Sequence, residues 1–103
     1  MTPPSKSSPQ PTPDGFLVRN VVVTNRFGIH ARPAALIVKA ASGFDCEIFV
    51  EKDGMRINAK SIMGLLTLEG AHGSELVLFA RGHDAPQALD ALLELFAKNF
   101  FED

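Results

Sequence analysis

The sequence predicts an α+β domain in which antiparallel strands carry a layer of helices on one face. Strand-like and helix-like segments follow one another in the order βαββαβα. Asp53-Gly54 separates two neighbouring strand-like segments and is a strong signal for a tight hairpin. The chain has 103 residues, 46% of them hydrophobic, so it suits one domain with one modest core. A shallow surface site is therefore expected rather than a deep enclosed one.

The first folded segments surround a short loop. Residues 16–24 are rich in β-branched side chains and predict a strand. Residues 25–30 form a loop, and residues 31–42 have the periodicity of a helix with one buried stripe. Gly43 is expected to end this helix in the left-handed conformation that glycine adopts without steric cost. The stripe consists of Ala34, Ile37, Val38 and Ala41.

Three further strands follow from alternating patterns. Residues 46–51 and 55–59 are the two arms of the predicted hairpin, and residues 74–80 form the last strand. The side chains predicted to face the core are Cys46, Ile48 and Val50 in the first arm and Leu76, Leu78 and Ala80 in the last strand.

Two more helices complete the pattern. Ser61 is expected to cap a short helix that runs through Leu68. The last helix is predicted from Asp84 to about Phe100, with Asp84 as its cap and Gln87 at capping-box spacing. Its buried stripe consists of Leu89, Leu92, Leu93 and Phe96.

The N-terminal segment has a different composition from the rest. Residues 1–14 contain five of the seven prolines among serines and threonines, which predicts a disordered or polyproline-like tail before a domain at 15–103. The tail is either an inert extension or a docking segment, and its composition does not choose between them.

Overall composition excludes several classes of protein. A net charge of −2 argues against nucleic-acid binding. No apolar run is long enough to span a membrane, and the N-terminus lacks the apolar core of a secretory signal. Cys46 is the single cysteine. A cytoplasmic protein is the expectation.

The first candidate site is the start of the helix at residues 31–42. His30 precedes a helix N-terminus, whose free amide groups favour an anion. Arg32 adds a guanidinium suited to phosphate, and Pro33 fixes where the helix begins. The pattern predicts a nucleophilic histidine that carries a phosphoryl group. An ordinary helix cap beside a turn would have the same residues, and local chemistry leaves both interpretations open.

The second candidate site is the short helix after Ser61. Leu65 and Leu68 are spaced to face the core, which leaves three large apolar side chains for a docking surface or, in part, for the core. These are Ile62, Met63 and Leu66.

Other kinds of site are not indicated. His72 and His83 lack metal-ligand spacing with Cys46 or with each other, so neither a metal nor a cofactor is predicted. His72 is expected in a loop, and His83 is expected to take part in capping the last helix. No glycine-rich nucleotide loop and no nucleophile-elbow serine is present.

Together the two stretches resemble HPr, the family of histidine-containing phosphocarriers of the bacterial phosphoenolpyruvate-dependent phosphotransferase system. The family's active-site motif is usually Gly-Leu-His-(Thr or Ala)-Arg-Pro-Ala, and residues 28–35 are GIHARPAA. Residues 60–65, KSIMGL, resemble its regulatory serine motif. The similarity covers roughly residues 16–100. Ile29 for leucine, Glu69 where glycine is common, and the Pro-rich tail depart from the family pattern.

The resemblance implies an open-faced sandwich of four antiparallel strands and three helices. His30 would accept a phosphoryl group on Nδ1 from phosphorylated enzyme I, with Arg32 stabilising it, and would donate it to enzyme IIA domains. The protein would then be a carrier rather than an enzyme. Ser61 would be phosphorylated by HPr kinase/phosphorylase. The implied docking residues are Ala35, Lys39, Ile62, Met63 and Leu66.

Three functions remain open on the sequence. The chain is a phosphocarrier for sugar uptake, a nitrogen-branch or purely regulatory phosphocarrier, or an interaction module switched at Ser61. The presence of His30 counts against the third.

Overall fold

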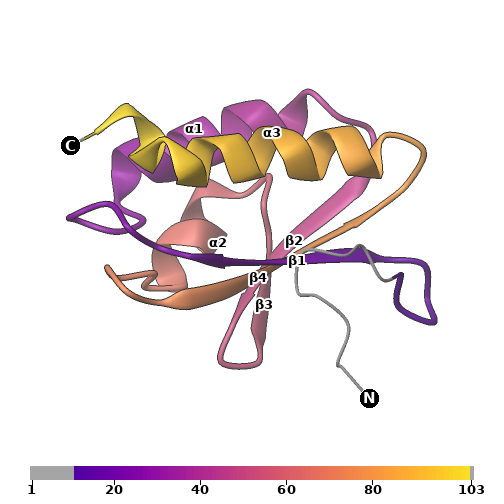
Figure 1. Cartoon of the computed structure of the whole chain (residues 1–103), viewed down its shortest axis with the longest axis horizontal. Coiled ribbons are helices and arrows are strands. Elements are labelled where there is room, and N and C mark those ends of the chain that lie inside the picture. Colours follow the sequence, from indigo (N-terminus) through magenta and orange to yellow (C-terminus); the bar gives the residue numbers. More distant parts are fainter. Residues whose placement is uncertain (1–10, 103) are drawn as a thin grey trace, which may run out of the picture.

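The structure, a computed structural model, describes residues 11–102. Its sheet has four antiparallel strands in the order β1-β4-β2-β3 (Figure 1). The elements are β1 (Leu17–Val22), α1 (Ala31–Ser42), β2 (Glu47–Lys52), β3 (Met55–Asn58), α2 (Ile62–Thr67), β4 (Glu75–Arg81), α3 (Ala85–Ala97) and a 3₁₀ turn, η1 (Asn99–Phe101). The predicted α+β class and the order βαββαβα are confirmed.

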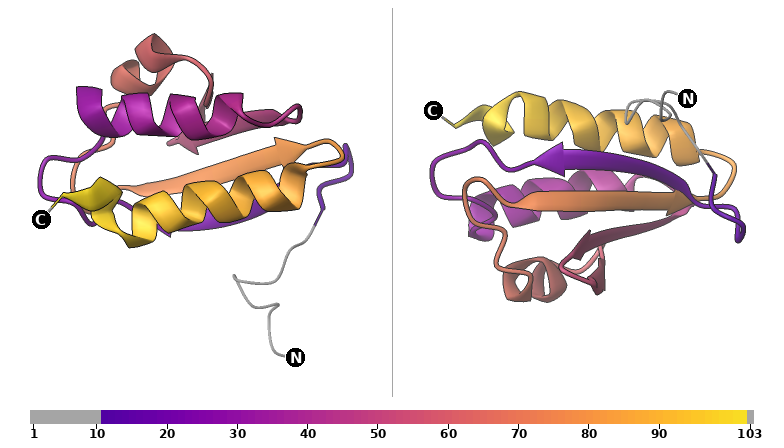
Figure 2. Two further views of the ribbon diagram at one scale, coloured as in Figure 1. Left: turned by 90° about the horizontal axis from the view of Figure 1, so that it is seen from above. Right: turned by 60° about the horizontal axis from the view of Figure 1, so that its bottom comes forward.

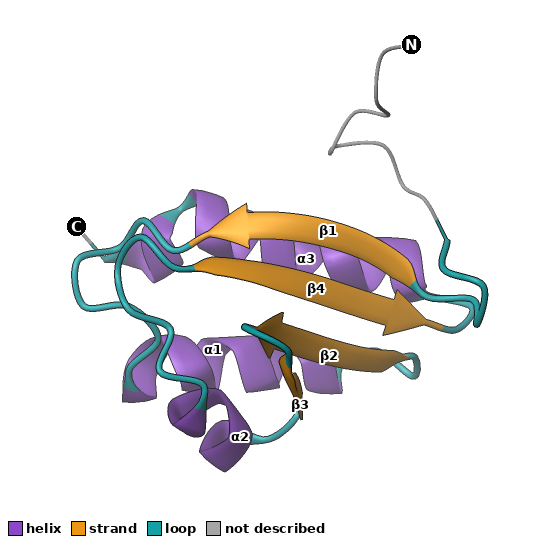
Figure 3. Cartoon of the chain, turned by 90° about the horizontal axis from the view of Figure 1, so that it is seen from below, coloured by secondary structure: helices purple, strands orange, loops and turns teal. Residues whose placement is uncertain are grey.

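The helices form a layer over one face of the sheet. Helices α1 and α3 lie side by side on it, and α2 lies beside α1 on the side away from α3 (Figures 2 and 3). The core fills the space between this layer and the sheet. Its largest fully buried side chains include Ile37, Ile48, Leu65, Leu76, Leu78, Leu89, Leu92 and Phe100.

The hairpin between β2 and β3 confirms the prediction from Asp53-Gly54. Lys52 at the end of β2 pairs with Met55 at the start of β3, so the connection consists of Asp53 and Gly54 alone. Both have positive φ, 51° at Asp53 and 83° at Gly54. Positive φ at both positions is the requirement of the hairpin turn that matches the twist of its strands.

The end of α1 corrects one prediction. Gly43 follows the helix as expected, but its φ is −78° and its conformation is right-handed. The N–H of Gly43 donates to the Ala40 carbonyl and that of Phe44 to the Ala41 carbonyl. These i→i−3 bonds tighten the last turn, so the carbonyls are satisfied without a left-handed residue.

The start of α3 corrects three further predictions, each about how this helix is capped. The Asp84 side chain makes no capping hydrogen bond to α3. Its carboxylate instead accepts the N–H groups of Asp45 and Cys46 before β2, at 2.9 and 3.0 Å. His83 pairs with the Asp45 carboxylate at 3.2 Å rather than capping the helix. Gln87 forms no capping-box bond within the described residues. Asp84 thus ties the β4–α3 connection to the α1–β2 connection.

Aromatic rings cover part of the face that the helices leave open. Phe16 lies edge-to-face against Phe49 and Phe79, with ring centroids 5.8 and 6.1 Å apart. The Cζ of Arg56 lies 4.1 Å from the centroid of Phe79, and that of Arg81 lies 4.3 Å from the centroid of Phe16. The two guanidinium groups therefore shield apolar rings from water while staying charged.

The residues just before β1 are held at the same face. The Phe16 N–H donates to the Thr12 hydroxyl at 2.9 Å, and the Gly15 N–H to the Thr12 carbonyl at 2.8 Å. Arg81 Nη1 donates to the Asp14 carbonyl at 2.9 Å. Residues 1–10 of the predicted disordered tail lie outside the described residues. Within the described part, no helix is both long enough and apolar enough to cross a membrane.

One strained residue at the end of α2 gives a test of the fold. Glu69 has a φ of 56°, a conformation that a Cβ disfavours by about 1 kcal/mol or more. Glu69→Gly should therefore raise the free energy of unfolding by about 0.5–1 kcal/mol, measured by denaturant titration. Glu69→Ala is the control, because it removes the carboxylate and keeps the Cβ. A gain in both variants would assign the effect to charge instead.

Candidate functional site

His30 is placed by a close contact between two loops. A Cβ on Gly28, which has a φ of 66°, would lie 2.3 Å from the Gly70 carbonyl oxygen, and one on Gly70 would lie 2.8 Å from the Ile29 side chain. Because neither glycine has a side chain, the two loops come close enough for the Ile29 N–H to donate to the Gly70 carbonyl at 2.8 Å. Ile29 itself is buried. The loop before α1 is thus fixed against the loop after α2, and His30 is the next residue.

A buried asparagine organises the loop before α1. Asn25 is 1% exposed, and its Nδ2 donates to the Gly28 carbonyl at 2.8 Å. The Gly28 N–H returns a hydrogen bond to the Asn25 carbonyl at 3.3 Å. That same carbonyl lies 3.2 Å from His72 Nδ1. His72 itself lies in the turn before β4, which confirms it as a loop residue. No local motif in the sequence indicates this role for Asn25.

His30 is the residue that precedes α1, as predicted, and its side chain makes no capping hydrogen bond. The first helical N–H with a backbone acceptor is that of Ala34, which donates to the His30 carbonyl at 3.0 Å. Pro33 has no N–H, so the amide groups of Ala31 and Arg32 are the donors at this end that no described residue accepts. They carry the positive end of the helix dipole beside the imidazole.

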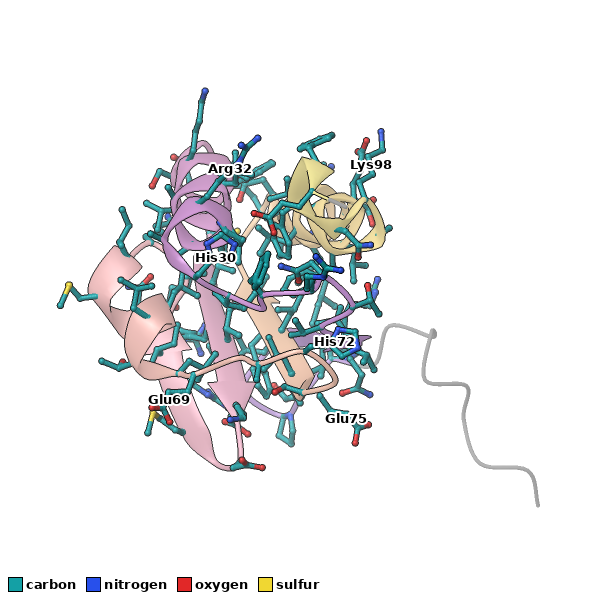
Figure 4. The ribbon with its side chains drawn as sticks, turned by 90° about the vertical axis from the view of Figure 1, so that its left-hand side faces the viewer. His30, Arg32, Glu69, His72, Glu75 and Lys98 are labelled. Carbon is teal, nitrogen blue, oxygen red and sulfur yellow. The ribbon has the colours of Figure 1, made fainter. Side chains whose placement is uncertain are left out.

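Arg32 lies at the same end of the molecule as His30 (Figure 4). It is exposed, and it lines a surface hollow together with Arg26 and Glu102. Two arginines at a helix N-terminus favour a bound anion. His30 and Arg32 thus lie at the same helix start, and their joint action on one phosphoryl group stays a prediction. Arg26 adds a second cation to the hollow that Arg32 lines, and no sequence motif indicates it.

Two exposed phenylalanines border this site. Phe27 and Phe101 are 70% and 62% exposed, and both line the hollow beside Arg32. The ring of Phe27 lies edge-to-face to the His30 imidazole, with centroids 6.2 Å apart. Large exposed rings around a charged hollow are typical of a surface that partners cover. Phe27 follows directly on Arg26, but nothing in the sequence marks Phe101 as its neighbour.

Among residues 11–102, the imidazole has one polar partner. His30 Nε2 lies 2.9 Å from a carboxylate oxygen of Glu102, and the two side chains are 39% and 18% exposed. The sequence gives no sign of this contact, because the two residues are 72 positions apart and no local motif surrounds Glu102.

Ser61 caps α2 as predicted. Its hydroxyl oxygen accepts the Gly64 N–H at 3.1 Å. Ile62 and Met63 are exposed, at 42% and 71%, as a docking surface requires. Leu66 is half-buried and packs against the core, which is one of the two places that the sequence left open for it, and its role in docking stays a prediction.

The two docking residues implied for α1, Ala35 and Lys39, are exposed. Because α1 and α2 pack together, the apolar side chains of α2 and these residues belong to one helical layer.

Cys46 has no chemistry to offer. It is 3% exposed, and burial, with the Asp84 carboxylate acting in the same direction, raises the pKa of its thiol to about 11. The thiol stays protonated and unreactive near neutral pH.

Three side chains near Cys46 could in principle hold a metal ion, because one nitrogen or oxygen atom from each of Asp45, His83 and Asp84 lies within 4.8 Å of the others. Both Asp84 oxygens already accept backbone N–H groups, so this exposed cluster is explained by loop bonding.

Comparison with known proteins identifies relatives over most of the chain. Residues 17–98 match a family model described as the PTS HPr component phosphorylation site. The phosphocarrier protein HPr of Treponema pallidum is 51% identical over 88 residues, which cover 85% of this chain and 100% of the relative. The HPr-like protein Crh of Halalkalibacterium halodurans is 46% identical over 80 residues, covering 78% of this chain and 95% of that protein.

A solved structure supports the same family assignment as the family model and the two relatives. The crystal structure of HPr from Thermoanaerobacter tengcongensis superposes with a TM-score of 0.81 at 43% identity. The match covers 84% of this chain and 97% of that one.

Proposed function

The chain belongs to the HPr family of phosphocarrier proteins, and from this premise we propose that His30 is the residue that carries the phosphoryl group. The observation that carries the proposal is the position of His30 directly before α1, half-exposed beside the free amide groups of Ala31 and Arg32. A nucleophile that becomes anionic when it is phosphorylated is stabilised there by the helix dipole and by the guanidinium of Arg32.

The transfer needs no further catalytic group from this chain. The lone pair of His30 Nδ1 attacks the phosphorus of the donor, and a bond from Nδ1 to phosphorus forms while the donor's own bond to phosphorus breaks. The electron pair of that bond stays with the donor, and the reverse events pass the group to an acceptor. Arg32 compensates the charge of the phosphoryl oxygens in both directions. The protein is therefore a carrier between partners, with a transient phosphohistidine.

The family supplies the partners for this scheme. Phosphorylated enzyme I is the proposed donor, and enzyme IIA domains in sugar uptake are the proposed acceptors, in the cytoplasm. The exposed Ile62 and Met63 on α2 and the exposed Ala35 and Lys39 on α1 form the proposed docking surface. Exposed apolar side chains beside the charged Lys39 suit successive partners better than a deep pocket does.

A regulatory role is the second candidate. Relatives named Crh match this chain at 46% and 47% identity, alongside the HPr match. Ser61 caps α2, where a phosphate is compatible with the helix N-terminus. Phosphorylation by HPr kinase/phosphorylase would add charge beside Ile62 and Met63, whose apolar surface must lose water when a partner docks. A nitrogen-branch or purely regulatory phosphocarrier would use the same chemistry with other acceptors.

His30→Ala should remove phosphoenolpyruvate-dependent labelling completely, since His30 is the proposed sole acceptor. The measurement is acid-labile phosphate after incubation with enzyme I and phosphoenolpyruvate, with thermal unfolding recorded in parallel. His83→Ala is the matched control, because His83 is exposed and pairs only with Asp45 among the described residues. Label remaining on His72 or His83 in the first variant would show the assignment to be wrong.

Arg32→Ala should slow transfer about tenfold or more, which is about 1.4 kcal/mol of barrier. The reason is that the guanidinium stabilises the phosphoryl group more than the free ring. Stability should change by less than about 1 kcal/mol, as for other exposed side chains. Rapid-quench kinetics in both directions measure the effect, and Arg32→Lys tests whether charge alone suffices. Equal rates for all three proteins would remove Arg32 from the site.

Ser61→Asp should raise the Michaelis constant of this protein as a substrate of enzyme I, with near-unchanged thermal stability. The added charge hinders desolvation of Ile62 and Met63, while an acid at a helix N-terminus is tolerated. Ser61→Ala is the control: it loses the bond to the Gly64 N–H, at a cost of about 1 kcal/mol, without adding charge. Met63→Ala should weaken docking independently. Phosphorylation of Ser61→Asp as efficient as that of the parent would contradict the switch.

A further inference from the structure

The chain beyond α3 turns back toward the candidate site. Asn99, Phe100 and Phe101 have φ values of 51°, 55° and 60°, so three successive residues are left-handed. Such a conformation is unfavourable at each position and needs support from its surroundings.

Packing provides this support. Phe100 is fully buried, with its ring 4.9 Å from that of Phe96. The side chain of Asn99 is hydrogen-bonded to Thr24, and the Glu102 N–H donates to the Asn99 carbonyl at 2.9 Å. The turn is therefore anchored in the core and to the loop before α1, and Glu102 is the next residue.

The Glu102 carboxylate is held from two sides. One oxygen lies 2.9 Å from His30 Nε2, and the other accepts the Asn25 Nδ2 hydrogen at 3.1 Å. Asn25 is in turn fixed by its own hydrogen bond to the Gly28 carbonyl. The carboxylate is less exposed than the imidazole that it contacts. A contact with this much support is built into the fold rather than a chance meeting of two surface side chains.

We propose that Glu102 is a positioning residue for the phosphoryl transfer: it holds a proton on His30 Nε2 and so keeps Nδ1 as the nucleophilic nitrogen. An ionised carboxylate only accepts hydrogen bonds, so Nε2 must donate. A neutral imidazole has one N–H, and its other nitrogen then has a free lone pair. This inference rests on the proposed function of His30.

The same contact acts during transfer. As Nδ1 bonds to phosphorus, the ring gains positive character, and the Nε2–H bond to Glu102 becomes a charge-assisted hydrogen bond. Glu102 therefore stabilises the ring when it is charged, while Arg32 stabilises the phosphoryl oxygens. Because Glu102 acts on Nε2 of the ring and Arg32 acts on the phosphoryl oxygens, substitutions of the two residues should affect the transfer rate independently.

The test uses Glu102→Ala, Glu102→Gln and a matched control, Glu94→Gln. Glu94 also loses one negative charge, but it lies on α3 and pairs with exposed Lys98. The first measurement is the nitrogen-15 NMR shifts of the His30 ring in the unphosphorylated protein, at a pH where the ring is neutral. In the parent and in Glu94→Gln, Nε2 should resonate as protonated and Nδ1 as unprotonated. In Glu102→Ala both shifts should move toward those of a neutral ring whose proton exchanges between Nδ1 and Nε2.

The second measurement is the single-turnover rate of phosphorylation. Glu102→Ala should be slower by about fivefold or more, which is about 1 kcal/mol of barrier. Glu102→Gln should lie between it and the parent, because it keeps a neutral acceptor. Thermal unfolding of each variant separates these effects from a loss of fold.

Two results would overturn the inference: ring shifts in Glu102→Ala identical to those of the parent, or faster phosphorylation of that variant, which would make Glu102 a competing anion. If the parent is never phosphorylated on His30, the proposed function fails, and the NMR measurement still decides whether Glu102 orients the ring.

Discussion

The close approach of Gly28 to Gly70 is the constraint on which the candidate site depends. Two loops far apart in sequence meet there with no room for a side chain on either glycine, and the Ile29 N–H closes the contact. This fixes the residue at which α1 begins. The free amide groups, the imidazole of His30 and the guanidinium of Arg32 then reach one end of the molecule together. A methyl group at either glycine would displace the loop rather than a single side chain, because the atoms in its way are backbone or the buried Ile29.

Local patterns predicted most of the fold. The bounds of α1, the Asp53-Gly54 hairpin and the Ser61 cap each depend on residues within a few positions of one another. Such features follow from backbone sterics and from hydrogen bonds to neighbouring amides. The candidate residues His30 and Arg32 could also be predicted from the sequence, because both belong to one helix start.

The errors have a common physical origin. Asp84 was expected to cap its own helix, but its carboxylate reaches the backbone before β2, 38 and 39 residues earlier. Glu102 reaches His30, and Phe101 reaches the hollow beside Arg32, because three left-handed residues, held by buried Phe100, reverse the chain after α3. Asn25 gives no signal either, since its role depends on both Gly28 and Glu102. Each of these contacts is decided by tertiary packing, which can override any local preference.

The two ends of the described chain lie on different sides of the molecule. The segment from Thr12 to Phe16 is fastened to the open sheet face by Arg81, at the end of the sheet away from α1's first turn (Figures 1 and 2). Glu102, by contrast, touches His30. For anyone attaching this protein to a resin, a dye or a fusion partner, the two attachment points are therefore not equivalent. A linker joined before residue 12 leaves the imidazole accessible, whereas one joined after Glu102 crowds the side chains that partners must approach.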